Sequence, residues 1–472
     1  MRRGVFALLV ALALAPAAHA GGPRMLLGAT EDNVRQPTLV AAKANVDLLR
    51  LAGFTAVRTT QVWAPGQTSL SEADLGPLRN AVDAAKLDGV EVVVSVTQFG
   101  SRTTPLTEQQ QADFASFSAW LAKQLPSVRR FIVGNEPNLN RYWLPQFNDD
   151  GSDAAAPAYE RLLALTYDAL KAVDPQLEVL GGAISPRGGD VPGTGRDTHS
   201  PTVFIRDLGA AYRSSGRTEP IMDALAFHPY EDNSSVAPID GTHPNTTSIA
   251  LADYPKLVAL LQEAFDGTAQ LGATLPIVYD EFGVETQIPD VKASLYTGRE
   301  PATIHPVDEA TQALYYRQAI QLAFCQPTVE GMFLFHSVDE SDFDRWQSGV
   351  YYADGTPKAS LVPTRAAIGE SRRGIVAHCP GLKLTVRPTI RAAGGTVVVG
   401  CDIDCAGDAR LLRRTKTVGR KPVHAIGGRT VTIRFRVKPG RYRVVVRVNA
   451  AVNPGVPAVR SAPITIARSG AS

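Results

Sequence analysis

A strand-like run followed by a helix-like segment recurs eight times between residues 24 and 371, and this repetition constrains the fold more than any other feature. The strand candidates are short and apolar along most of their length, which indicates strands buried on both faces. They are residues 25–30, 56–60, 90–96, 131–134, 179–184, 224–228, 277–280 and 331–336. Amphipathic stretches between them predict helices, among them residues 39–52, 72–87, 108–125, 159–173, 254–271 and 309–324.

Eight strand–helix units predict an α/β fold of the (β/α)₈ TIM barrel type. An open doubly wound sheet is the alternative, but it would want a Gly-rich phosphate turn after an early strand, and residues 28–32 (GATED) contain none. The connections expected after strands are long and rich in Gly, Pro, Asp, Asn and Thr. In a barrel these loops rise at one end, where barrel enzymes keep their active sites.

The pattern changes after about residue 379. Short alternating runs at residues 382–387, 396–399, 430–437, 442–448 and 463–466 predict strands separated by turns. We therefore expect a barrel domain over residues 21–378 and a small all-β, sandwich-like domain over residues 379–472. A basic cluster lies in the second domain, and a solvated face is favoured over binding to an acidic polymer. Its members are Arg410, Arg413, Arg414, Lys416, Arg420 and Lys421.

Residues 1–20 have the features of a secretory signal peptide. Arg2 and Arg3 precede an apolar core at residues 5–14, and the small-x-small site Ala18-His19-Ala20 stands before Gly21. That core is too short to span a bilayer, and no other run approaches the required length. We expect a secreted protein without an integral membrane segment after cleavage. The formal net charge of +2 argues against nucleic acid as the main partner.

Four cysteines in an exported chain indicate two disulfides and not a metal site. Cys325 ends the seventh predicted helix and Cys379 follows the eighth, so both should lie at the bottom of the barrel, where we expect them to pair. Cys401 and Cys405 would then close a small loop in the β domain. Both bonds are expected to stabilise the fold.

Two of the predicted strands end on a glutamate. Residues 131–138 read FIVGNEPN, and Pro137 cannot extend a strand, so Glu136 stands at a strand end. Glu281 ends the seventh strand, which faces the fourth across the mouth of an eight-stranded barrel. Two such carboxylates can be the pair that hydrolyses glycosides, one protonated and one ionised, because like charges in a low dielectric push their pKa values apart.

The segments FIVGNEPN, AFHPY (226–230) and PIVYDEFG (276–283) resemble clan A glycoside hydrolases, the retaining barrel enzymes that include families 5 and 39. The resemblance covers about residues 24–371. It implies that Glu136 is the general acid/base and Glu281 the nucleophile. It also implies that Asn135 bonds the sugar's 2-hydroxyl. Further roles are implied for Arg58, which steadies the nucleophile, and for His228 and Tyr230, the latter donating a hydrogen bond to Glu281.

Asp280 is a competing choice for the nucleophile. Successive side chains of a strand point to opposite faces, so only one of Asp280 and Glu281 should point into the mouth. The resemblance selects Glu281.

Many clan members end strand eight with a tryptophan, but residues 333–336 read FLFH here. Either Phe335, His336 or Trp346 takes its place, or the sugar subsite is built differently. Trp63, Tyr142 and Trp143 are further candidates for stacking on a sugar, with packing under a long loop as the alternative.

The acidic residues 339–344 (DESDFD) lack the Gly and terminal Glu of a helix–loop–helix calcium site, so a solvated loop is favoured. We expect neither a metal nor an organic cofactor.

The sequence thus predicts a secreted retaining glycoside hydrolase acting on an oligosaccharide, polysaccharide or glycoside. The alternatives are a catalytically inactive carbohydrate-binding or cell-surface barrel, and a transglycosylase with the same site.

Overall fold

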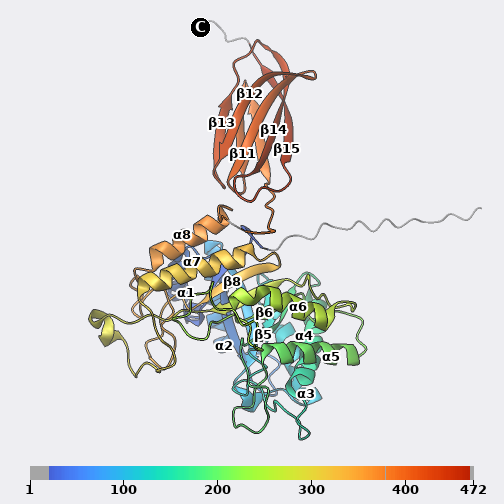
Figure 1. Ribbon diagram of the computed structural model, residues 1–472, viewed down its shortest axis with the longest axis vertical. Helices are drawn as coiled ribbons and strands as arrows, with labels where there is room; N and C mark the ends of the chain where they lie inside the picture. The colour runs from blue at the N-terminus through green and yellow to red at the C-terminus, as the bar shows by residue number, and fades with distance from the viewer. Residues whose placement is uncertain (1–20, 378, 468–472) are drawn as a thin grey trace, which may run out of the picture.

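The computed structural model describes residues 21–377 and 379–467, and within them a closed barrel of eight parallel strands forms the larger domain (Figure 1). The strands follow one another around the barrel in chain order, which confirms the predicted (β/α)₈ fold. They are β1 (Leu26–Thr30), β2 (Ala56–Trp63), β3 (Glu91–Gln98), β4 (Arg130–Val133), β5 (Glu178–Ile184), β6 (Ala224–Phe227), β7 (Ile277–Phe282) and β8 (Val329–Phe335). The predicted signal peptide lies outside the described residues.

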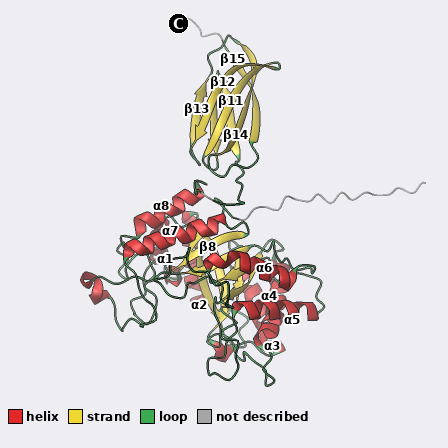
Figure 2. Ribbon diagram, viewed as in Figure 1, coloured by secondary structure: helices red, strands yellow, loops and turns green. Residues whose placement is uncertain are grey.

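Helices surround the barrel (Figure 2). They are α1 (Leu39–Ala52), α2 (Glu72–Asp88), α3 (Glu108–Gln124), α4 (Ala155–Val173), α5 (Pro201–Ser214), α6 (Tyr254–Phe265), α7 (Glu309–Cys325) and α8 (Leu361–Arg372). Local signals set their ends: Thr107 and Gln110 form a capping box at the start of α3. Helix α6 ends six residues earlier than predicted. The backbone leaves the helical region at Asp266 (φ −58°, ψ 141°), whose carboxylate accepts the Ala273 N–H further along the chain.

The barrel interior is filled by a small apolar core of its own. Its buried members are Ala56, Val93, Ile132, Leu180, Ala183, Ala224, Ala226, Val278 and Phe333. A Cβ on Gly28 would lie 2.6 Å from the Phe333 ring, so the glycine makes room for that ring. The barrel is therefore packed below and can hold a cavity at its mouth.

The C-terminal region forms two antiparallel sheets, in the orders β13-β10-β9 and β12-β11-β14-β15. Their strands are β9 (Pro388–Ala393), β10 (Thr396–Cys401), β11 (Cys405–Arg413), β12 (Lys416–Ala425), β13 (Thr430–Arg434), β14 (Gly440–Ala450) and β15 (Ala458–Ile466). This agrees with the predicted all-β domain, and the boundary predicted at 378/379 falls between α8 and β9.

Individual strands of this domain differ from the prediction. Residues 382–387 contain only an isolated bridge from Leu384 to Pro454, whereas β9, β11 and β12 were not predicted. Strand β12 lies at a sheet edge and is exposed along most of its length, so its sequence lacks the apolar alternation that signals a half-buried strand.

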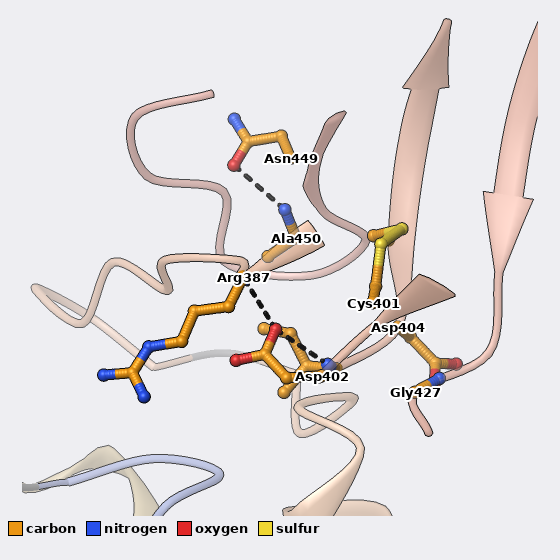
Figure 3. Close-up of a disulfide and its surroundings, with 9 residues drawn as sticks. Arg387, Cys401, Asp402, Asp404, Gly427, Asn449 and Ala450 are labelled. Carbon is orange, nitrogen blue, oxygen red and sulfur yellow. Dashed lines mark hydrogen bonds between the residues drawn. A yellow bond between two sulfur atoms is a disulfide. The ribbon is translucent and has the colours of Figure 1, made fainter. Parts of the chain in front are cut away.

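Both expected disulfides are present, and both lie near the junction of the two domains. Cys325–Cys379 joins the end of α7 to the connection after α8, and Cys401–Cys405 closes the turn between β10 and β11. Beside Cys401, the Asp402 carboxylate accepts the Arg387 N–H and Asp404 accepts the Gly427 N–H (Figure 3).

Two ion pairs also connect the domains: Arg24 with Asp402 at 3.1 Å and Arg373 with Asp404 at 2.6 Å. The β domain stands off the barrel at the end of α8 (Figure 1). Within the described residues, no helix has both the length and the apolar character needed to cross a membrane.

Candidate active site

Glu136 is held at the mouth by a sharp reversal of the chain after β4. Gly134 has φ of 82° and Glu136 itself φ of 42°, a left-handed conformation that few residues other than glycine adopt. The Glu136 N–H donates to the Ala183 carbonyl of β5 at 2.8 Å, which holds the strained turn in place. The Glu136 side chain lines a cavity of about 530 Å³.

Asn138 ties the loop after β4 to the loop after β5. Its buried amide donates to the carbonyls of Ser185 (3.2 Å) and His199 (3.0 Å) and accepts the Ser185 N–H (3.0 Å). The Asn-Glu-Pro-Asn segment therefore supplies both the carboxylate and the anchor of its loop.

Glu281, from the end of β7, receives two hydrogen bonds, one from a strand and one from the loop after β6. Arg58 on β2 donates to Glu281 Oε1 at 2.7 Å, and the Tyr230 hydroxyl donates to Oε2 at 3.1 Å. Arg58 also donates to Asn135 Oδ1 at 3.2 Å. Burial raises the pKa of Tyr230 well above its usual value, and Glu281 raises it further, so Tyr230 stays a neutral donor.

His228, just after β6, joins the two glutamates. Its Nδ1 lies 3.0 Å from Glu136 Oε1 and 3.5 Å from Glu281 Oε2, and its Nε2 lies 3.3 Å from Asp280 Oδ2. Burial opposes a charge on the ring, but Glu281, Asp280 and the hydrogen bonds to Asp280 and Glu136 outweigh it and raise the pKa of His228 well above its usual value. Both ring nitrogens face carboxylate oxygens, which only accept, so this environment favours the protonated imidazole that donates from both nitrogens.

Asp280 joins the charged cluster beside Glu281. Both Asp280 and Glu281 contact Arg58 and His228, so the two side chains do not take opposite faces of β7 as the alternation of a regular strand predicts. The pairing of β7 with β8 shifts register between Tyr279 and Phe282, and such an irregularity breaks the alternation of side chains. Glu281 lines the cavity, whereas Asp280 is fully buried beneath it.

The two adjacent carboxyl groups differ in acidity. Burial raises the pKa of Asp280, but His228 and Arg58 outweigh burial and hold it below its ordinary value. Burial, with the nearby Glu136 and Asp280, raises the pKa of Glu281 above its ordinary value in spite of His228 and Arg58. Sequence reasoning missed Asp280 as a member of the site, and two consecutive acids at a strand end were its only signal.

Aromatic side chains form one wall of the cavity. The half-buried Trp346 ring lies 5.0 Å from the Tyr230 ring and 5.1 Å from that of Phe335, and all three line the cavity with His336. A second cavity of about 200 Å³ adjoins it and is lined by Arg58 and Asn135. Both cavities share Asp32, Tyr142, Glu281, Phe335 and His336.

Trp63 and Trp143 are not brought to the mouth. Trp63 is fully buried against Phe114 and donates to the Gln67 carbonyl, and Trp143 is buried against Tyr159. These two rings have the alternative use foreseen for them, packing beneath a loop. A larger cavity of about 810 Å³ lies along α4 and α5, and neither Glu136 nor Glu281 lines it.

A buried ion pair braces the loops around the mouth. Lys358 donates to Asp339 at 2.8 Å, to Thr286 Oγ1 at 2.7 Å and to the Gln347 carbonyl at 3.0 Å. Asp339 also accepts the Tyr296 hydroxyl at 2.8 Å, so it acts as a loop brace. No group of three or more His, Cys, Asp or Glu in the described parts of the chain has the geometry of a metal site.

Comparisons with known proteins bear on the fold. No protein-family model and no curated protein matches the chain. The chain is similar to a family 39 glycoside hydrolase from Bacteroides cellulosilyticus WH2, with a TM-score of 0.51 and 17% identity over 92% of this chain and 74% of that one.

Two other solved structures are similar at lower scores. They are the GH39 enzyme from Xanthomonas axonopodis pv. citri (TM-score 0.49, 15% identity, 88% of this chain and 92% of that one) and a monomeric beta-xylosidase from Caulobacter crescentus CB15 (TM-score 0.47, 15% identity, 95% and 96%). The Bacteroides likeness, which spans most of both chains, shows that this protein shares its fold with a family 39 glycoside hydrolase.

Proposed function

We propose that the protein is a secreted glycoside hydrolase that cleaves O-glycosidic bonds with retention of anomeric configuration. The observation that carries the proposal is the position of His228 Nδ1 between Glu136 and Glu281. Distances of 3.0 and 3.5 Å from one nitrogen place the two carboxylate oxygens at most 6.5 Å apart. Retaining enzymes separate their carboxyl groups by about 5–5.5 Å and inverting enzymes by about 6.5–9.5 Å, so this upper bound is compatible with retention and lies at the lower limit for inversion.

In the first step Glu281 attacks the anomeric carbon while Glu136 gives its proton to the oxygen of the leaving group. The glycosidic C–O bond breaks and an ester bond forms between the sugar and Glu281. In the second step Glu136 takes a proton from water, whose oxygen attacks the same carbon and releases Glu281. Asn135, which Arg58 orients, is placed to bond the sugar's 2-hydroxyl, and Trp346 offers an aromatic surface in place of the tryptophan that strand eight lacks.

The charges of the groups around Glu136 and Glu281 suit these two steps. With a proton on Glu136, the cations Arg58 and His228 balance the carboxylates of Asp280 and Glu281. Formation of the ester removes the charge of Glu281 and leaves one on Glu136. The Nδ1–H of His228 is within reach of the Glu136 and Glu281 carboxylates. It can stabilise the negative charge on Glu281 before the ester forms and on Glu136 afterwards. Asp280 is a positioning residue, because it keeps the His228 ring charged and oriented through Nε2.

Export is the other part of the proposal. It is supported by the signal-like sequence of residues 1–20 and by the two disulfides, which persist in oxidising compartments.

The test is a screen of aryl glycosides, followed by NMR of the anomeric configuration of the first product. Retention is expected, and an inverted product would contradict the assignment. For Glu136→Ala, added azide should restore cleavage of substrates with good leaving groups and yield a glycosyl azide of retained configuration. Binding of saccharides without turnover would identify the inactive-barrel alternative, and transfer to an added acceptor sugar would identify a transglycosylase.

A further inference from the structure

Charge is segregated between the two domains far more than the overall balance of +2 suggests. Residues 379–467 contain 17 Lys and Arg but only three Asp and no Glu, whereas residues 21–378 contain 28 Lys and Arg against 43 Asp and Glu. Asp402 and Asp404 are already paired with Arg24 and Arg373 at the junction, which leaves Asp408 as the third acid of the β domain.

The four-stranded sheet displays part of this charge on its outer face. Along β14 the side chains of Tyr442, Val444, Val446 and Val448 are buried, so Arg441, Arg443 and Arg447 point outward and are exposed. The strand register places Arg410 and Asp408 on β11, which neighbours β14. Arg420 lies on β12, on the other side of β11. We call Arg410, Arg420, Arg441, Arg443 and Arg447 the arginine face.

Most of this charge has no counter-ion. Asp408 pairs with Arg410 and Arg420, and these two are the only basic residues of 379–467 that form an ion pair with another described residue. Neighbouring strands lie about 4.8 Å apart and alternate residues of one strand about 6.7 Å apart, so the arginines are attached at short intervals across the outer face of the sheet.

We propose that the arginine face binds an acidic polysaccharide whose carboxylates recur along an extended chain. Guanidinium groups pair with carboxylates through two parallel hydrogen bonds, and a periodic row of one matches a periodic row of the other. Both aromatic rings of residues 379–467, Phe435 and Tyr442, are buried. The face therefore lacks the stacking platforms used for nucleic-acid bases and for neutral sugars.

The acidic charge of the barrel determines how the protein is oriented on such a polymer. A polyanion attracts the β domain and repels residues 21–378, so the polymer is a support that holds the molecule with the barrel turned away. This inference goes beyond the proposed hydrolysis and does not depend on it, and the Glu281→Ala variant should bind the polymer as the unaltered protein does.

The experiment measures binding of the full chain to polygalacturonate by calorimetry at low salt and in about 1 M NaCl, where the Debye length falls to about 3 Å. The test variant is Arg441→Ser/Arg443→Ser/Arg447→Ser. The control, Arg391→Ser/Arg429→Ser/Arg434→Ser, removes the same charge from exposed positions on or beside the three-stranded sheet. Binding should vanish at high salt, and the affinity should fall about tenfold or more in the test variant and less than about threefold in the control.

Equal losses in the two variants would overturn the proposal, because they would mean that total charge and not this face is responsible. Tighter binding to polyphosphate or to phosphatidylserine vesicles than to polygalacturonate would assign the face to a phosphate-bearing partner instead. Salt-sensitive self-association that the test variant abolishes would assign it to the acidic barrel of a second copy. If the triple variant does not fold, Arg447→Ser alone provides the same comparison against Arg434→Ser.

Discussion

The barrel mouth and the arginine face are both crowded with charge, but the charges are arranged differently. At the mouth Arg58, His228, Asp280 and Glu281 are buried and each has an opposite partner within 3.6 Å. On the arginine face the side chains are exposed and most have no partner among the described residues. Buried, paired charges depend on one another, so a single change unbalances the group, whereas exposed charges act almost independently. This difference distinguishes the proposed catalytic site from the proposed binding surface.

The strongest test of the mouth is the removal of its proposed nucleophile. Glu281→Ala should lower kcat by about 10⁴-fold or more, because no other carboxylate can form the ester at that point. Steady-state hydrolysis of an aryl glycoside measures the effect. The control, Glu263→Gln, alters an exposed carboxylate that pairs with Arg206 on the outside of the barrel and should behave as the unaltered protein. Near-normal turnover by Glu281→Ala would refute the assignment.

Loss of the buried cation that braces the loops should have the largest effect on stability. Lys358→Met leaves Asp339 without its counter-ion and should lower the free energy of unfolding by about 3–5 kcal/mol. Denaturant titration measures this quantity. The double variant Lys358→Met/Asp339→Asn removes the unpaired carboxylate charge and should regain part of the lost free energy of unfolding. No gain would mean that Lys358 stabilises the protein through packing.

Asp280→Asn tests whether His228 depends on its buried partner. Asp280 is one of the groups that raise the pKa of His228, so its neutralisation should let the ring lose its proton at a lower pH. We expect the alkaline limb of the kcat profile to move to lower pH. At its optimum kcat should fall about 10- to 100-fold, since hydrogen bonds to charged groups contribute about 1.5–3 kcal/mol.

The matched control for Asp280 is Asp153→Asn, which alters another carboxylate 3.3 Å from a buried histidine, His199, beside α4 and α5. It should leave the pH profile in place. An Asp280 variant with an unmoved profile and only a lower melting temperature would reduce Asp280 to a structural role.

The smallest effect is expected from the arginine face. Arg441→Ser/Arg443→Ser/Arg447→Ser should leave kcat on a small aryl glycoside unchanged and shift the free energy of unfolding by no more than about 0.5 kcal/mol per site. Turnover and thermal unfolding of the same preparation check both. A large loss of either would show that these charges are coupled to the fold or to the mouth.

The sequence by itself determined the barrel, both strand-end glutamates and both disulfides. Apolar strands buried on two faces and capped helices are local patterns, and Glu136 and Glu281 stand where those strands stop. The tertiary structure alone decided three other matters. An irregular register in β7 brought Asp280 under the site, and loop packing buried Trp63 and Trp143. Residues 405–413 became β11 by pairing with β14, and residues 416–425 became β12 by pairing with β11. These depend on contacts between residues far apart in the chain, and no local pattern encodes such contacts.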